Sequence, residues 1–167
     1  ETVIAGIGQG FVLTTPIQLA VMAARIGNGR KAVKAKLLSD HAKNSDEFQS
    51  LNISGTVLKE IQRSMRSVVA GGRGTARNYD LKGYGMAGKT GTVQVKRISK
   101  AERDEGIIDN TDRRWKDRDH ALFVAYAPYE KPKYAISVIV EHGGSGSSMA
   151  APIARDILKF ALDRQSI

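Results

Sequence analysis

Apolar residues recur at helical spacing in three segments of the 167-residue chain. The first helix is expected over about residues 15–27, where Thr15 can cap the first turn and Pro16 suits a position that needs no N–H. A Gly-Asn-Gly run at 27–29 should end it. Because its residues are apolar on nearly every side, the pattern predicts that this helix is buried.

The other two helices each carry one apolar face. One is expected over about residues 54–70, with Ser54 as its cap and two glycines after its end. The other is expected over about residues 148–164, with Ser148 as its cap and Pro152 in or near its first turn, where proline is tolerated. The apolar faces follow helical spacing and comprise Val57, Leu58, Ile61, Met65, Val68 and Val69 in the former and Ile153, Ala154, Ile157, Leu158, Ala161 and Leu162 in the latter.

Three further segments are predicted to be strands. Residues 85–95 are mostly small or β-branched, and residues 120–127 form an apolar run that Pro128 closes. Residues 134–141 follow after a short turn, so the last two strands should pair as an antiparallel hairpin. The order of elements predicts an α+β fold, in which two helices precede a three-stranded antiparallel sheet and a final helix packs on that sheet.

The connecting segments are polar, charged or rich in glycine. Residues 34–38 are a candidate for a short strand, residues 39–53 are predicted to be a loop, and residues 142–147 are predicted to be a flexible link. Residues 96–119 hold eight basic and seven acidic side chains. They are too charged for a core, so we interpret them as a long insertion between the first two strands.

Composition indicates a folded domain, since 41% of the residues are hydrophobic and 26% are charged. The formal net charge is +9, but the basic excess is spread thinly along the chain. Aromatic residues make up 6%, and no series of them alternates with lysine or arginine to form a platform for stacking bases. Nucleic-acid binding is therefore disfavoured, and a mildly basic surface facing an anionic polymer accounts for the charge equally well.

The absence of cysteine excludes disulfides, cysteine metal ligands and a cysteine nucleophile. The longest apolar run, residues 121–127, is far shorter than the roughly 20 residues that a membrane-spanning helix needs. The sequence does not open with a signal peptide, so any targeting segment is expected upstream. No cofactor and no metal are expected.

The sequence KTGT at residues 89–92 carries the clearest candidate chemistry. On a strand, alternation places Lys89 and Gly91 on one face and Thr90 and Thr92 on the other. Glycine lets a peptide backbone approach an edge strand, and threonine hydroxyls can donate to a carboxylate. The lysine supplies positive charge, and backbone N–H groups can stabilise an oxyanion. The competing interpretation is an ordinary edge strand with a surface lysine.

Three other motifs, taken in order with this one, resemble the class B penicillin-binding proteins, and the Gly-Gln-Gly form is most similar to the elongation type. These are IGQG at residues 7–10 followed by PIQLA at 16–20, GRGTA at 72–76, and DHALFVAYAP at 119–128. Together with AGKTGT at 87–92 they cover the chain nearly from end to end.

The resemblance implies a peptidoglycan D,D-transpeptidase that cross-links stem peptides through a serine acyl-enzyme. It implies a periplasmic enzyme held in the inner membrane by an N-terminal helix. Its implied partners are the stem peptide or its lipid-linked precursor, β-lactams and the membrane proteins of the elongation complex. By this resemblance, Lys89 provides positive charge and a hydrogen-bond link to a Ser-x-Asn motif, and Gly91 keeps the strand narrow because it has no side chain. Thr90 and Thr92 face substrate, with the Thr92 N–H as an oxyanion donor and Thr92 as the best candidate for the terminal carboxylate.

The sequence departs from the family at the nucleophile, because no serine is followed three residues later by lysine. Ser50-Leu51-Asn52 matches the letters of the second motif but follows Gly-Gln-Gly inside a polar loop, so we interpret it as coincidence. The chain therefore resembles the C-terminal portion of a transpeptidase domain. We expect it to be inactive alone and to associate through exposed apolar faces. The alternative is a non-catalytic module that binds cell-wall peptide or a protein through the same strand.

The remaining titratable clusters have simpler interpretations. His120 precedes a strand without a second ligand at metal spacing, so a structural role is favoured, and His142 is interpreted as a rim residue. The pair Asp40 and His41 lies in a polar loop and is taken to be a solvated turn. The acidic residues Glu102, Asp104 and Glu105 alternate with basic ones, which favours a solvated loop over a metal site.

Overall fold

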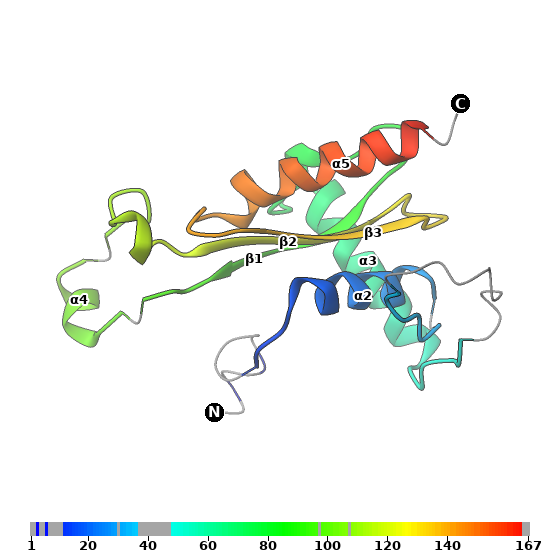
Figure 1. Ribbon diagram of the computed structural model, residues 1–167, viewed down its shortest axis with the longest axis horizontal. Helices are drawn as coiled ribbons and strands as arrows, with labels where there is room; N and C mark the ends of the chain where they lie inside the picture. Colours follow the sequence, from blue (N-terminus) through cyan, green and yellow to red (C-terminus); the bar gives the residue numbers. More distant parts are fainter. Residues whose placement is uncertain are drawn as a thin grey trace.

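The computed structural model describes residues 12–29, 31–36, 48–96, 98–106 and 108–164, together with Val3 and Gly6. Figure 1 shows a three-stranded sheet with helices on both faces. The elements are, in chain order, α2 (Pro16–Gly27), α3 (Gly55–Ala70), η2 (Arg77–Tyr79), β1 (Ala87–Val93), α4 (Lys100–Asp104), η3 (Trp115–Asp117), β2 (His120–Ala127), β3 (Tyr134–Val140), the π-helical turn η4 (Gly146–Ala150) and α5 (Ala151–Asp163).

The sheet is antiparallel throughout, with β2 between β1 and β3. Thr90 lies opposite Phe123 in one ladder, and Val124 lies opposite Ser137 in the other. The predicted α+β class, the three strands and the β2–β3 hairpin are therefore confirmed. The sheet places the KTGT sequence on an edge strand.

The two faces of β2 enter two separate cores. Phe123 and the alanines at alternate positions lie in a cluster with Leu158 and Leu162 of α5. Tyr126, from the opposite face, packs with Met65 and Ala87. Figure 1 shows α5 on one face of the sheet and α2 on the other. The apolar run of β2 is thus explained by burial on both faces.

Helix α3 lies beside β1 and contributes to both cores. Its Met65 belongs to the cluster with Tyr126, and its Val69 belongs to the cluster with Leu158. Figure 1 shows α3 passing from the α5 side of the sheet to the α2 side, which explains how its apolar side chains reach both cores.

Of the three predicted N-terminal caps, only that of α2 forms in the structure. Thr15 forms a capping box with Gln18, and Pro16 occupies the first turn of α2, as predicted. Ser54 precedes α3, but its side chain makes no capping bond. Ser148 is not a cap, because it lies within the π-helical turn that precedes α5. At the start of α5, the π-helical turn continues directly into the helix, so no serine cap is needed there.

The prediction that α2 is buried is wrong for much of the helix. Ala23 and Gly27 are buried, whereas Ile17 is 58% exposed and Met22 is 42% exposed. A Cβ on Gly27 would lie 3.0 Å from the Tyr126 ring, so small residues allow close packing on the sheet. Ile26 also packs against the core on this face, whereas Ile17 and Met22 remain largely in contact with solvent.

The connections differ from the predictions in two places. Within the predicted strand 34–38, the described residues 34–36 form no strand, although Lys31 makes an isolated bridge to Ser50. The link after β3 was predicted to be flexible, but the Gly144 N–H donates to the Asp119 carbonyl oxygen at 2.8 Å. The motif at residues 7–10 and the pair Asp40 and His41 lie outside the described residues.

The charged insertion extends away from the sheet (Figure 1). It contains the short helix α4, where Ser99 and Glu102 form a capping box. Hydrogen bonds from Lys96 and from the Ser99 N–H and hydroxyl lower the pKa of the exposed Glu102 to about 2. Across the described part of the chain, no helix combines the length and apolar character needed to cross a membrane.

Candidate active site

The KTGT residues lie on the free edge of the sheet. β1 pairs with β2 on one side, and among the described residues no strand pairs with its other side. Lys89 and Thr92 are exposed, and Thr90 and Gly91 are partly buried. Residues 89–92 therefore lie on an edge strand, as expected from the sequence pattern.

The side chains alternate as predicted from the strand pattern. Thr90 and Thr92 lie opposite Phe123 and Ala121, which face α5, so the two threonines share that face. Lys89 lies on the other face, and its Nζ donates to the Thr90 carbonyl oxygen at 2.7 Å. The strand thus presents a cation on one side and two hydroxyls on the other.

Backbone groups of the same strand point out from the free edge. In an antiparallel ladder, the N–H and C=O of one residue point towards one neighbour and those of the next residue point the other way. The Gly85 carbonyl oxygen accepts from the Tyr129 N–H at 3.1 Å, which is the β2 side. Alternation therefore directs the backbone groups of Gly88, Thr90 and Thr92 outward. Those of Thr92 include the predicted oxyanion donor.

A residue outside β1 holds the Thr90 side chain. The hydroxyls of Thr75 and Thr90 lie 2.8 Å apart within a hydrogen bond. Thr75 follows the turn after α3, where a Cβ on Gly74 would lie 2.2 Å from the Val68 carbonyl oxygen. The GRGTA motif at 72–76 thus places a hydroxyl against β1. The motif was noted in the sequence, but its contact with Thr90 was not predicted.

Glycines allow close packing on and within this part of the sheet. A Cβ on Gly88 would lie 2.5 Å from the Phe123 ring. A Cβ on Gly146, in η4, would lie 2.3 Å from the Leu122 carbonyl oxygen and 2.4 Å from that of Gly91. The π-helical turn therefore rests directly on the backbone of β1 and β2.

The histidines lie together at the end of β2 next to the insertion. The His142 N–H donates to His120 Nδ1 at 2.9 Å, and the rings of Trp115 and His142 are 4.3 Å apart. His142 Nδ1 lies 3.0 Å from the Arg118 carbonyl oxygen and donates to it. These contacts bind the insertion to the link after β3. Among the described residues, no three histidine, aspartate or glutamate side chains form a metal-binding group.

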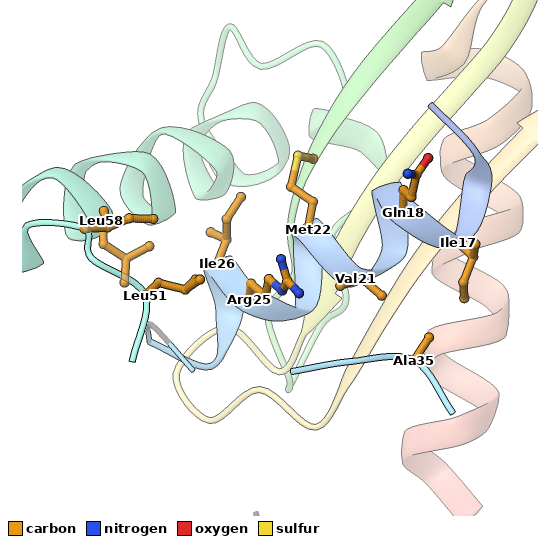
Figure 2. A pocket seen from close by; sticks show the side chains of 10 residues that line it. Ile17, Gln18, Val21, Met22, Arg25, Ile26, Ala35, Leu51 and Leu58 are labelled. Carbon is orange, nitrogen blue, oxygen red and sulfur yellow. The ribbon is translucent and has the colours of Figure 1, made fainter. Parts of the chain in front are cut away.

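The Ser50-Leu51-Asn52 sequence lies away from any catalytic grouping. Ser50 belongs to the bridge with Lys31, and its hydroxyl donates to the Leu51 carbonyl oxygen. Leu51 lines an apolar cavity of about 570 Å³ between α2, α3 and the segment that connects them. Figure 2 shows Met22, Ile26 and Leu58 on its wall. None of its ten lining residues belongs to β1.

The cavity offers packing surface rather than chemistry. Its polar lining side chains are Gln18 and Arg25, and the Arg25 Nε donates to the Val33 carbonyl oxygen at 3.0 Å. Among the described residues that line it, none is a nucleophile or a general base. The edge of β1 therefore remains the candidate site.

Comparisons with known proteins agree on one family. The family model described as penicillin binding protein transpeptidase domain matches residues 1–159. The peptidoglycan D,D-transpeptidase MrdA of Haemophilus influenzae is 34% identical over 175 residues, which cover 99% of this chain and 26% of that relative. MrdA of Acinetobacter baumannii is 36% identical over 166 residues, which cover 92% of this chain and 24% of that protein.

Solved structures give the same result. The structure of Pseudomonas aeruginosa PBP2 in complex with WCK 5153 is 34% identical with a TM-score of 0.71, over 97% of this chain and 32% of that one. The complex between PBP2 and MreC from Helicobacter pylori is similar at 30% identity and a TM-score of 0.72, over 98% of this chain and 27% of that one. The chain spans about a quarter of the length of the curated relatives it matches.

Proposed function

The chain belongs to the penicillin-binding protein transpeptidase family, and from this membership we propose that it forms the substrate-docking side of a peptidoglycan D,D-transpeptidase of the elongation type. Its α+β fold is the corresponding part of the penicillin-binding transpeptidase fold. The observation that carries the proposal is the free edge of β1, which presents Lys89, Thr90 and Thr92 together.

The proposed chemistry follows from the groups on that edge. A D-Ala-D-Ala peptide lies along β1 as an added strand and pairs with the outward backbone groups. The hydroxyls of Thr90 and Thr92 donate to its terminal carboxylate, and Lys89 adds positive potential. The Thr92 N–H stabilises the oxyanion that forms when a serine attacks the carbonyl carbon. A β-lactam carries the same carboxylate and carbonyl, so it competes for the same edge.

The attacking serine is proposed to lie outside residues 1–167, since no Ser-x-x-Lys occurs in the sequence. The terminal D-Ala leaves as an amine, and the acyl group passes to the amine of a second stem peptide. The 167-residue chain alone is then unable to turn over substrate.

The cellular setting is part of the proposal. The similarity to MrdA supports action on stem peptides or their lipid-linked precursor in the periplasm, with an anchor in the inner membrane. The similarity to a PBP2 solved with MreC supports membrane proteins of the elongation complex as partners. The insertion exposes one aromatic ring, Trp115, among side chains of both signs, and a single ring in a nearly neutral segment does not favour nucleic acid instead.

Acylation of the full-length gene product by a fluorescent penicillin tests the function. Thr92→Val removes the hydroxyl proposed to bind the carboxylate, and Thr56→Val is a matched change at an exposed position on α3. A hydrogen bond to a charged group contributes about 1.5–3 kcal/mol, so Thr92→Val should lower the acylation rate constant roughly ten- to hundredfold. Equal rate constants in the two variants would contradict the docking role of Thr92.

A further inference from the structure

An ion pair outside the docking strand holds the residue at which its free edge begins. We propose that Arg66 and Asp80 are positioning residues for the docking edge, which they fix in register by binding both backbone polar groups of Met86. Neither residue needs to touch substrate. The inference rests on the proposed function and adds to it two residues that the KTGT motif does not include.

The geometry joins three parts of the chain at one point. Arg66, on α3, binds Asp80 through two hydrogen bonds, Nη1 to Oδ1 at 2.6 Å and Nη2 to Oδ2 at 2.8 Å. The same Nη1 donates to the Met86 carbonyl oxygen at 2.8 Å. Asp80 Oδ1 accepts from the Met86 N–H at 3.1 Å. Both polar backbone groups of Met86 are therefore bound by one ion pair.

Met86 is the first of the outward-facing residues. Alternation from Gly85, whose carbonyl oxygen is bonded on the β2 side, places Met86, Gly88, Thr90 and Thr92 in one outward series. Because the ion pair occupies Met86, an added peptide strand finds its first unoccupied position at Gly88. The ion pair thus marks the end of the docking edge. It also fixes the register in which an added strand would pair with Thr90 and Thr92.

The surroundings of the ion pair make it a rigid reference point. The Met86 side chain is fully buried in the core beneath α5. The Arg66 guanidinium lies over the Tyr129 ring, 5.6 Å from its centroid, and the Tyr129 N–H binds the Gly85 carbonyl oxygen. Met86 and Thr92 are six residues apart, or about 20 Å along a strand. A shift of the strand at Met86 would therefore move the threonines relative to the nucleophile.

The pair needs a charged carboxylate and a guanidinium. Burial acts to raise the pKa of Asp80, but the hydrogen bond and charge of Arg66 and the N–H groups of Met86 and Leu81 together lower it below its usual value. The side chains of Arg66 and Asp80 are 25% and 29% exposed, so water screens them only in part. Lysine lacks the planar fork that binds a carboxylate and a carbonyl oxygen at once, so Arg66→Lys is not a neutral change.

The test measures acylation of the full-length gene product by a fluorescent penicillin over a range of concentrations, which separates the apparent binding constant from the rate constant at saturation. Arg66→Lys is compared with Arg114→Lys, the same change in an exposed ion pair with Asp117 on the insertion. We expect Arg66→Lys to lower the saturating rate constant at least tenfold, because small misplacements cost that much or more. Arg114→Lys should match the wild-type protein.

A merely structural role gives a different result. Partial unfolding reduces the amount of protein that is acylated but leaves the rate constant of the folded molecules unchanged, and melting curves record the folded fraction independently. Asp80→Asn keeps an acceptor for the Met86 N–H and Asp80→Leu does not, so the rate constant should fall further in Asp80→Leu.

Two outcomes overturn the inference alone. These are a wild-type rate constant in Arg66→Lys, or a loss that is confined to the acylated amount and follows melting temperature. Failure of the wild-type protein to acylate would instead overturn the proposed function, and the positioning role with it.

Discussion

The hydroxyl of Thr75 reaches a strand that lies 15 residues further along the chain, where it bonds to Thr90. Thr75→Val removes this bond while keeping a β-branched side chain of similar shape. A hydrogen bond between neutral groups contributes about 1 kcal/mol. The acylation rate constant at low penicillin concentration should therefore fall about fivefold in the full-length gene product.

Thr75→Ser is the matched control, because it keeps the hydroxyl that binds Thr90. Its acylation rate constant should remain close to that of the wild-type protein. The role of Thr75 would be contradicted if the valine and serine variants behaved alike.

The charge of Asp80 leads to a prediction about acid stability. Its pKa is lowered in the folded protein relative to the usual value of 3.8. A lowered pKa means that the ionised form stabilises the folded state above the unfolded pKa, and that this stabilisation is lost as the pH falls through the folded pKa. Asp80→Asn should therefore unfold more easily than the wild-type protein at pH 5–7, and the difference should shrink below about pH 4.

Denaturant titrations of both proteins across this pH range measure the difference in unfolding free energy. A difference that grows as the pH falls would contradict the lowered pKa of Asp80. Lys159→Gln serves as the comparison, because it removes an exposed ion pair with Asp163 within α5.

Among the elements, η4 packs so closely on the sheet that Gly146 has no room for a side chain. A Cβ on Gly146 would lie 2.3 Å from the Leu122 carbonyl oxygen, which is closer than real Cβ atoms approach. Gly146→Ala should destabilise the protein by about 1–3 kcal/mol, as overpacking does, and should displace β1 at Gly91. Chemical denaturation measures the first effect and the acylation rate constant measures the second.

Gly72→Ala provides the control for η4, because a Cβ on Gly72 would meet no atom within 4 Å. It should leave both stability and acylation nearly unchanged. If Gly146→Ala were equally harmless, then η4 would not press on the backbone of β1 as the structure indicates.

The strands were predictable because their signals are local. The run at 120–127 is apolar on both faces, and the short turn before residue 134 specifies an antiparallel partner. The burial of α2 was not predictable, because an apolar helix can be covered on one side only. Its contacts depend on Ala23 and Gly27, the small residues that let it approach the sheet.

The candidate site likewise has a part that the sequence predicts and a part that it does not. Lys89, Thr90, Gly91 and Thr92 could be found because they are contiguous and match a motif. Arg66 and Asp80 could not be found, because they meet Met86 from positions 20 and 6 residues away and form no sequence pattern. Contacts made only through tertiary packing leave no periodic signal in the chain.

At the scale of the whole molecule, large apolar side chains remain on the surface of the 167-residue chain. Ile17 on α2 and Val57 on α3 are 58% and 53% exposed, and α2 lies on the face of the sheet opposite α5 (Figure 1). Exposed patches of this kind drive association. We expect the isolated chain to sediment as a dimer or larger assembly, and Ile17→Glu with Val57→Glu to shift it towards the monomer.

Sedimentation velocity over a range of micromolar concentrations measures this assembly. A well-folded monomer at every concentration would contradict the prediction. Glu60→Gln, at an exposed polar position on α3, controls for the effect of changing charge.

We propose that this chain supplies the docking edge of a serine acyl-transferase whose nucleophile lies outside residues 1–167. The most direct measurement is mass spectrometry of the penicillin-treated full-length gene product, with the acylated serine located by peptide mapping. We expect one penicilloyl adduct on a serine outside residues 1–167, slower formation of that adduct in Lys89→Ala, and no adduct on the isolated chain. An adduct on a serine within residues 1–167, or no adduct on the full-length protein, would contradict it.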